Sequence, residues 1–162
     1  MRELVFLWLL IMMVFCSVSV KSQSVQLLKL DQLEQRFEKG KDTVYIVNFW
    51  ASWCAPCLKE LPHFKKLSQE IKSDKVKVLL VSLDFKSKLK SAVVPITKRL
   101  KLKNEVYLLD EADQQQYIER INKEWSGALP ATLLVNKTKN KRVFKEQEFT
   151  YPELIKLYQQ NK

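Results

Sequence analysis

After its first twenty-odd residues, the chain alternates between two patterns of apolar positions. One is typical of buried strands and the other of helices with one apolar face. Short runs that are mostly apolar and rich in β-branched side chains predict strands buried on both faces, as in a parallel sheet. These runs are 43–50, 76–83, 106–109 and 131–135. Apolar residues three and four positions apart predict helices between and beyond these strands. The predicted helices are 27–37, 56–71, 87–102, 114–122 and a last one from Tyr151.

The order of these elements predicts the fold class. Strands that alternate with helices form a mostly parallel sheet with helices on both faces. Residues 142–149 follow a polar turn and predict an antiparallel hairpin partner for the strand before them. Gly40 can close the first helix, and Pro95 breaks or restarts the helix in which it lies. We therefore predict an α/β domain, a three-layer sandwich whose central mixed sheet is flanked by helices.

The N-terminal segment differs from the rest of the chain. After a start that contains Arg2, residues 4–15 are all apolar. A basic start before an apolar run of about 7–15 residues predicts a secretory signal peptide, whereas a membrane-spanning helix needs about 20. We expect residues 1–22 to be a signal peptide, with a retained anchor or a buried helix as alternatives. Residues 23–162 then form one domain.

Cysteine usage fits an exported protein. The chain has three cysteines, and removal of the leader takes Cys16 away and leaves Cys54 and Cys57. An even pair suits a periplasmic or other extracytoplasmic compartment, where disulfides persist. A structural zinc site takes four ligands as a rule, and this pair with the single histidine His63 cannot supply them. We expect no metal, while a purely structural disulfide stays open as an alternative.

Composition and charge narrow the classes of function further. With two glycines, the chain cannot form a glycine-rich phosphate loop of the Rossmann or Walker kind. The formal net charge of +10 would suit nucleic acid, a membrane surface or acidic partners. The basic residues are spread along the chain among apolar ones, and no nucleic-acid-binding motif accompanies them. We therefore predict a solvated basic surface and no nucleic-acid partner.

The pair Cys54 and Cys57 carries the clearest chemistry. Cys54 lies where a predicted strand turns into a helix, and Cys57 lies one turn further on. Residues so spaced bring their Cβ atoms near the separation that a disulfide requires. The free N–H groups and positive end of the helix lower the pKa of the Cys54 thiol. We predict that Cys54 is an accessible attacking thiolate. Cys57, on the apolar face with Leu61 and Phe64, would resolve the mixed disulfide.

Two segments resemble landmarks of a known family. Residues 48–57, NFWASWCAPC, resemble the active-site segment of thioredoxin-fold proteins, above all the exported thiol–disulfide oxidoreductases of the TlpA/ResA type. Those proteins carry a tryptophan before the motif, here Trp53, and an E-x-P after it, here residues 60–62. Residues 127–132, GALPAT, resemble the family's cis-proline loop. Together the two landmarks are specific.

The resemblance implies a thioredoxin-like fold, no cofactor and a defined set of site residues. Cys54 and Cys57 would be catalytic. The residues that would contact the substrate are Trp53, Pro56, Leu129 and Pro130, the last of them after a cis peptide bond. Leu129 would pair its backbone with the substrate peptide.

Two acidic residues are candidate proton acceptors for Cys57. Ordinary thioredoxins have a buried aspartate where this chain has Asn48, whose amide cannot carry a proton. The resemblance to ResA-type proteins implies an acid near the end of the next strand instead, where Asp84 lies. A strand-end turn residue is the alternative reading of Asp84. Glu60, one turn past Cys57, is the second candidate, with a solvated helix face as its alternative.

We predict a thiol–disulfide oxidoreductase that reduces disulfides of exported proteins, with apocytochrome c among the candidate substrates. Residues 55–56, Ala-Pro, keep the proline of reducing motifs and lack the histidine of strong oxidants. The expected partners of this monomer are disulfide-containing exported proteins and a membrane thiol or electron donor. The alternatives are a disulfide oxidase or isomerase, and a peptide-binding module without turnover. A peroxiredoxin-type peroxidase is disfavoured because no P-x-x-x-T-x-x-C motif precedes Cys54.

Overall fold

The computed structural model describes residues 24–40, 42–71 and 75–162. The segment interpreted above as a signal peptide or anchor lies outside the described residues. Within the described ranges, none of the helices combines the length and the apolar character that crossing a bilayer requires.

A single mixed sheet runs through the described part of the chain, with its strands in the order β1-β4-β3-β2-β5-β6. The strands are β1 (Gln26–Leu28), β2 (Val44–Trp50), β3 (Val76–Ser82), β4 (Glu105–Leu109), β5 (Ala131–Asn136) and β6 (Lys141–Lys145). The first four pair in parallel, and β5 and β6 join them antiparallel. The predicted mostly parallel sheet with an antiparallel end is confirmed.

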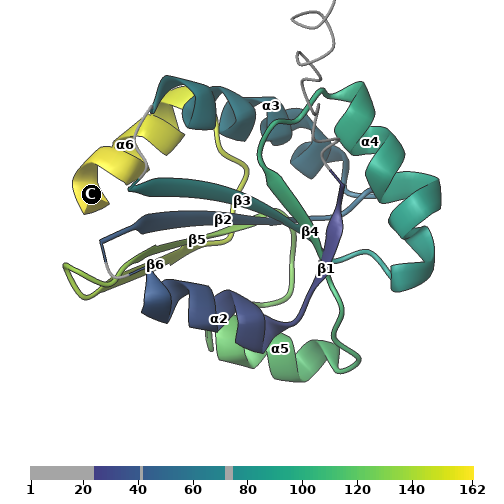
Figure 1. Cartoon of the computed structure of the whole chain (residues 1–162), viewed down its shortest axis with the longest axis horizontal. Helices are drawn as coiled ribbons and strands as arrows, with labels where there is room; N and C mark the ends of the chain where they lie inside the picture. Colours follow the sequence, from purple (N-terminus) through teal and green to yellow (C-terminus); the bar gives the residue numbers. More distant parts are fainter. Residues whose placement is uncertain (1–23, 41, 72–74) are drawn as a thin grey trace, which may run out of the picture.

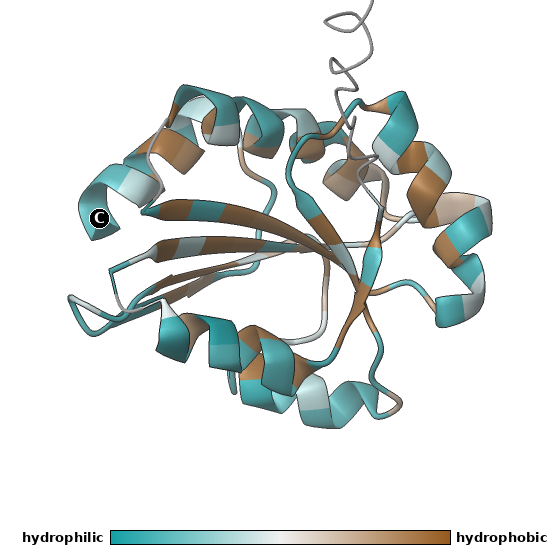
Figure 2. Cartoon of the chain, in the orientation of Figure 1, coloured by the Kyte–Doolittle hydropathy of each residue, from teal (hydrophilic) through white to brown (hydrophobic). Residues whose placement is uncertain are grey.

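Helices cover both faces of this sheet and complete the predicted three layers. They are α2 (Leu30–Lys39), α3 (Ala55–Glu70), α4 (Val94–Arg99), α5 (Gln114–Ile121) and α6 (Tyr151–Asn161). Figure 1 shows α3, α4 and α6 on one side of the sheet and α2 and α5 on the other. The apolar sides of the helices face the sheet, whose central strands β2 and β3 are apolar over most of their length (Figure 2). The thioredoxin-like fold class is confirmed.

The central strand β2 explains how the two core layers arise. All seven of its residues are buried, and successive side chains of a strand point to opposite faces. Ile46 and Trp50 pack with α3 and α6, whereas Val47 and Phe49 pack with α2 and α5. Asn48 lies two residues from both Ile46 and Trp50, so its amide points to the same face of the sheet as their side chains and faces α3. A polar group at this position needs a partner inside the core.

The start of the fold differs from the sequence prediction. The periodicity placed one helix over 27–37, but Gln26–Leu28 forms β1 and α2 begins only at Leu30. β1 pairs in parallel with the end of β4, at the edge of the sheet. Three residues are too few to display a period of two, so their apolar positions merged with the helical pattern that follows. Gly40 ends α2 as predicted, and its N–H donates to the Arg36 carbonyl.

Two further predicted elements are shorter than expected. The helix predicted over 87–102 is a 3-10 turn, then a π-helical turn at Leu89–Val93, and only then α4. Pro95 lies in the first turn of α4, where its missing N–H needs no helical partner. The strand predicted over 142–149 ends at Lys145. The remaining predicted helices and strands agree with the structure to within one or two residues.

Candidate active site

The cysteine pair sits where the central strand passes into α3. β2 ends at Trp50, and Cys54 is the N-cap residue of the helix that begins at Ala55. The Cys54 Sγ accepts a hydrogen bond from the Cys57 backbone N–H at 3.3 Å. Pro56 is exposed in the first helical turn, where a missing N–H is harmless. The helix N-terminus is therefore directed at the Cys54 sulfur, as the sequence predicts.

Cys54 and Cys57 form a disulfide. Their Sγ atoms are 2.02 Å apart and their Cα atoms 5.3 Å apart. Only 5% of Cys54 and none of Cys57 is exposed. The prediction that Cys54 is accessible is therefore wrong for this oxidised form, because its sulfur is bonded inward to a residue of the core. The neighbouring Trp53, in contrast, is 72% exposed and marks the outer surface of the site.

Glu60 lies inside the protein beneath the cysteine pair. It is fully buried on the same stripe of α3 as Cys57 and Leu61. Its Oε1 accepts a hydrogen bond from the Asn48 amide at 2.7 Å, and its Oε2 accepts one from the Phe149 backbone N–H at 2.7 Å. The alternative of a solvated helix face is wrong, because residues three apart on a helix share a face.

Burial changes the protonation chemistry of Glu60. Loss of solvation is the dominant cause, and it raises the pKa of the carboxyl to about 7. The hydrogen bonds from Phe149 and Asn48 lower the pKa, and the negative charge of Glu148 raises it. Glu60 can therefore bind or release a proton near neutral pH, one helical turn from Cys57.

Asp84 lies beyond the end of β3 and is also buried. Its Oδ2 accepts hydrogen bonds from the Ser52 N–H at 2.8 Å and from the Ser82 hydroxyl at 2.7 Å. Its Oδ1 accepts one from the Ser52 hydroxyl at 2.6 Å. These contacts fit the strand-end alternative, since they tie the end of β3 to the loop before Cys54.

The loop before β5 meets the cysteine pair at the same edge of the sheet. The Leu129–Pro130 peptide bond is cis, and Ala131 then pairs with Phe49 at the end of β2. Leu129 lines a depression together with Trp53. The fold thus brings both segments noticed in the sequence, far apart along the chain, to one place. Pro130 itself is buried.

Sequence reasoning missed one exposed aromatic residue in this region. Phe85 follows Asp84 and lines the same depression as Trp53 and Leu129. The available signal was weak: an aromatic residue directly after a strand-end aspartate, outside any helical or strand period. Its importance depends on the loop geometry, which a pattern of apolar positions does not encode.

A metal centre is not formed by the side chains that the structure describes. Nowhere in these ranges do three or more histidine, cysteine, aspartate or glutamate side chains gather in a way that could hold an ion. Cys54 and Cys57 are bonded to each other, so neither offers a thiolate ligand in this state.

Sequence comparison finds relatives with thiol–disulfide chemistry. Sporulation thiol-disulfide oxidoreductase A of Bacillus subtilis is 49% identical over 45 residues, 28% of this chain and 26% of that protein. Thiol-disulfide oxidoreductase ResA of Geobacillus kaustophilus is 29% identical over 104 residues, 64% of this chain and 55% of that protein. The chain thus matches from about a quarter to just over half of these relatives' lengths.

Solved structures similar to this chain and a matching family model also indicate its relatives. The crystal structure of StoA from Bacillus subtilis has a TM-score of 0.56 at 28% identity, covering 73% of this chain and 84% of that one. A thioredoxin-related protein from Neisseria meningitidis serogroup B has a TM-score of 0.65 at 23% identity, covering 75% and 86%. The resemblance to ResA-type proteins is confirmed. The model of the AhpC/TSA family matches residues 16–143, well over half of the sequence, and the chain belongs to this family.

Proposed function

We propose that this protein is a thiol–disulfide oxidoreductase that works through Cys54 and Cys57. The observation that carries the proposal is the disulfide at the N-terminus of α3, with a buried carboxylate of raised pKa one turn further along the same helix face. A purely structural disulfide has no need of such a group. The curated relatives named as thiol-disulfide oxidoreductases support the same chemistry.

The proposed reaction begins from the reduced dithiol. The Cys54 thiolate, stabilised by the helix N-terminus, attacks one sulfur of a substrate disulfide and expels the other as a thiolate. A mixed disulfide between Cys54 and the substrate results. The Cys57 thiolate then attacks the Cys54 sulfur and releases the second substrate thiol. The substrate gains two electrons, and the protein ends in the disulfide form of the structure.

Glu60 is the proton acceptor in this scheme. Cys57 must lose its proton before it attacks, and burial raises the cost of forming its thiolate. Glu60 lies one turn away on the same buried face, about 5–6 Å between Cβ atoms for this spacing. With a pKa of about 7 it can take that proton at neutral pH. Asp84 fits less well, because its oxygens are engaged by Ser52 and Ser82.

The proposed direction is reduction, in an extracytoplasmic compartment. Ala55 and Pro56 between the cysteines support a reducing motif. The apolar run 4–15 supports export, whether the segment is cleaved as a leader or retained as an anchor. Cleavage would also remove Cys16 and leave the even pair Cys54 and Cys57. The partners would be disulfide-containing exported proteins and a membrane thiol or electron donor that restores the dithiol. We propose that the protein acts as a monomer.

Reduction of insulin disulfides in the presence of dithiothreitol tests the activity. The expected result is catalytic precipitation of the insulin B chain by the wild type and none above background by Cys54→Ser. Equality of the wild type and the variant would reject the enzyme and leave a structural disulfide or a binding module. Equilibration with glutathione buffers tests the direction. A potential near that of strong oxidants, about −120 mV, would favour the oxidase alternative.

A further inference from the structure

A depression of about 380 Å³ lies at the carboxyl ends of β3 and β4 and extends to Trp53, the residue before Cys54. Its apolar lining comes from separate loops and elements: Trp53, Leu83, Phe85, Leu109, Tyr117 and Leu129. Two of these are aromatic side chains that water reaches freely, Trp53 at 72% and Phe85 at 82% exposed. Leu27, at 39%, is the other large apolar side chain exposed in the described residues.

Exposed aromatic side chains gathered at one place indicate a binding surface. An aromatic residue buries a large area on contact, and its flat ring loses little freedom when it is covered. Single exposed apolar residues are ordinary. Trp53 and Phe85, however, line the same depression, and Trp53 directly precedes Cys54 in the sequence. Their arrangement therefore suits a side chain that enters between them.

Hydrogen bonds join the two segments that carry the aromatic side chains. Ser52, which precedes Trp53, is bound by Asp84, which precedes Phe85, at 2.6 Å and 2.8 Å. The Leu83 N–H also donates to the Trp50 carbonyl at 2.8 Å. The two segments are thus joined before a ligand arrives, so the ordering that accompanies binding is that of the exposed aromatic side chains.

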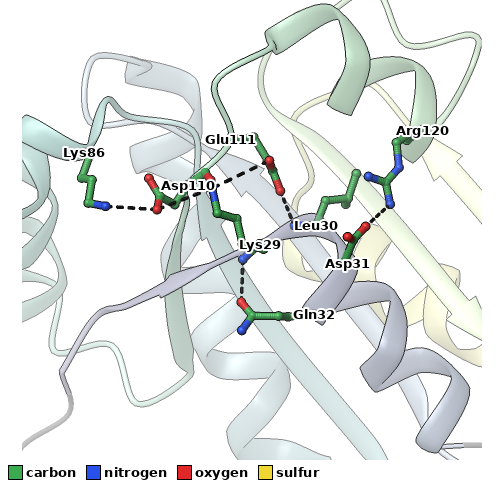
Figure 3. A network of polar contacts seen from close by, with 8 residues as sticks. All are labelled: Lys29, Leu30, Asp31, Gln32, Lys86, Asp110, Glu111 and Arg120. Carbon is green, nitrogen blue, oxygen red and sulfur yellow. Dashed lines mark hydrogen bonds and ion pairs between the residues drawn. The ribbon is translucent and has the colours of Figure 1, made fainter.

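The polar end of the depression is neutralised by the protein itself. Figure 3 shows Lys86 and Lys29 directed at Asp110 and Glu111. The Lys86 Nζ lies 3.1 Å from the Asp110 carboxylate, and the Lys29 Nζ lies 3.6 Å from it. Glu111 accepts a hydrogen bond from the Leu30 N–H at 2.7 Å. Asp110 and Glu111 therefore both have partners within the chain.

We propose that Phe85 is a specificity-determining residue that forms, with Trp53 and Leu129, a subsite for a bulky apolar side chain. This rests on the proposed function and names its substrate class. The preferred substrates are extended polypeptide segments in which an aromatic or long aliphatic residue stands close in sequence to the disulfide-bonded cysteine.

A pair of synthetic disulfide-bonded peptides tests the proposal. The two peptides are identical except that phenylalanine or serine stands beside the cysteine under attack. The wild type should reduce the phenylalanine peptide about 10-fold more efficiently, the low end of what a good apolar pocket discriminates. Phe85→Ala should bring this ratio close to one, mainly by raising KM for the phenylalanine peptide. Phe85→Leu should retain part of the preference.

Leu27→Ala is the matched control, since Leu27 is an exposed apolar residue on β1 outside the lining of the depression. It should leave the ratio at the wild-type value. Equal efficiency of the wild type on both peptides, or an equal loss on both in Phe85→Ala, would overturn the proposal. Reaction of the wild-type dithiol with a small aromatic disulfide distinguishes failure of the proposed function from failure of the proposed subsite. If that reaction also fails, the oxidoreductase function fails; if it proceeds, only the subsite does.

Discussion

At the scale of single residues, the proposed chemistry depends on one carboxyl group that the fold has removed from water, that of Glu60. Two hydrogen bonds would keep the pKa of Glu60 low in water-like surroundings, but full burial outweighs them. Asn48 donates to Glu60, while its own Oδ1 is buried without a hydrogen-bond partner in the described structure. If the amide group rotates by half a turn, its oxygen can accept a hydrogen bond from a protonated carboxyl, just as its NH2 group donates one to an ionised carboxylate. Asn48 can therefore serve both protonation states.

The neighbours of Glu60 should move its pKa in opposite directions. Asn48→Ala removes a hydrogen bond that lowers the pKa, so the value should rise above about 7. Glu148→Gln removes a negative charge that raises it, so the value should fall. Titration of the carboxyl carbon by NMR in the oxidised protein measures both. Shifts of the same sign in the two variants would contradict this account of the site.

The residue scale also separates what the sequence predicts from what it does not. The cysteine spacing predicts the disulfide, and the apolar helix face predicts the burial of Cys57, whereas the expected accessibility of Cys54 is not met in the oxidised form. The burial of Glu60 was within reach, since it stands three positions after Cys57 on an apolar stripe. The solvated helix face nevertheless stands as an alternative for Glu60 on sequence grounds, because carboxylates are usually exposed to water. The partners of Asp84 depend on where two loops meet, which local periodicity does not contain.

At the scale of elements, the site is the meeting of a helix start and a loop. α3 brings Cys54 to the end of β2, and β5 begins beside it after the cis bond. Long strands and helices were predictable because several turns or alternations repeat the same signal. β1 and the π-helical turn were not, since each holds too few residues to show a period.

The loop before β5 depends on Gly127. This residue has a φ of +90°, a conformation that side chains other than hydrogen disfavour. A Cβ there would also come within 3.0 Å of the Ile118 Cδ1. Gly127→Ala should lower the free energy of unfolding by about 1–2 kcal/mol. Urea denaturation of the oxidised protein measures it, with Gly127→Asn as the control that should lose less, because asparagine tolerates positive φ. Equal stability of wild type and Gly127→Ala would be the contrary result.

At the scale of the whole molecule, the packed core couples the ionisation of Glu60 to stability. The sheet buries its central strands on both faces, which the apolar runs of the sequence predict well. The same packing removes Glu60 from water, and its pKa is therefore higher in the folded protein than in the unfolded chain. A group of this kind lowers the free energy of unfolding progressively as the pH rises from its pKa in the unfolded chain to its pKa in the folded protein.

The stability of the wild type should accordingly fall, relative to Glu60→Gln, as the pH rises from about 4.5 to about 7. In that interval the unfolded chain has released the proton that the folded protein retains. Below it both states are protonated, and above it both are ionised, so the difference is constant there. The total change is roughly 3 kcal/mol, at about 1.4 kcal/mol per unit of pKa. Urea titrations at pH 4 and pH 8 measure it, and parallel behaviour of the two proteins would refute the buried ionisation.

Trapping the mixed disulfide tests the central claim most directly. After reduction, Cys57→Ser and Cys54→Ser are each mixed with a disulfide-bonded peptide and analysed by intact mass. The account predicts a one-to-one covalent adduct on Cys54 in Cys57→Ser, and little or none on the buried Cys57 in Cys54→Ser. An adduct that forms equally in both variants, or in neither, would contradict the assignment of Cys54 as the nucleophile and Cys57 as the residue that resolves it.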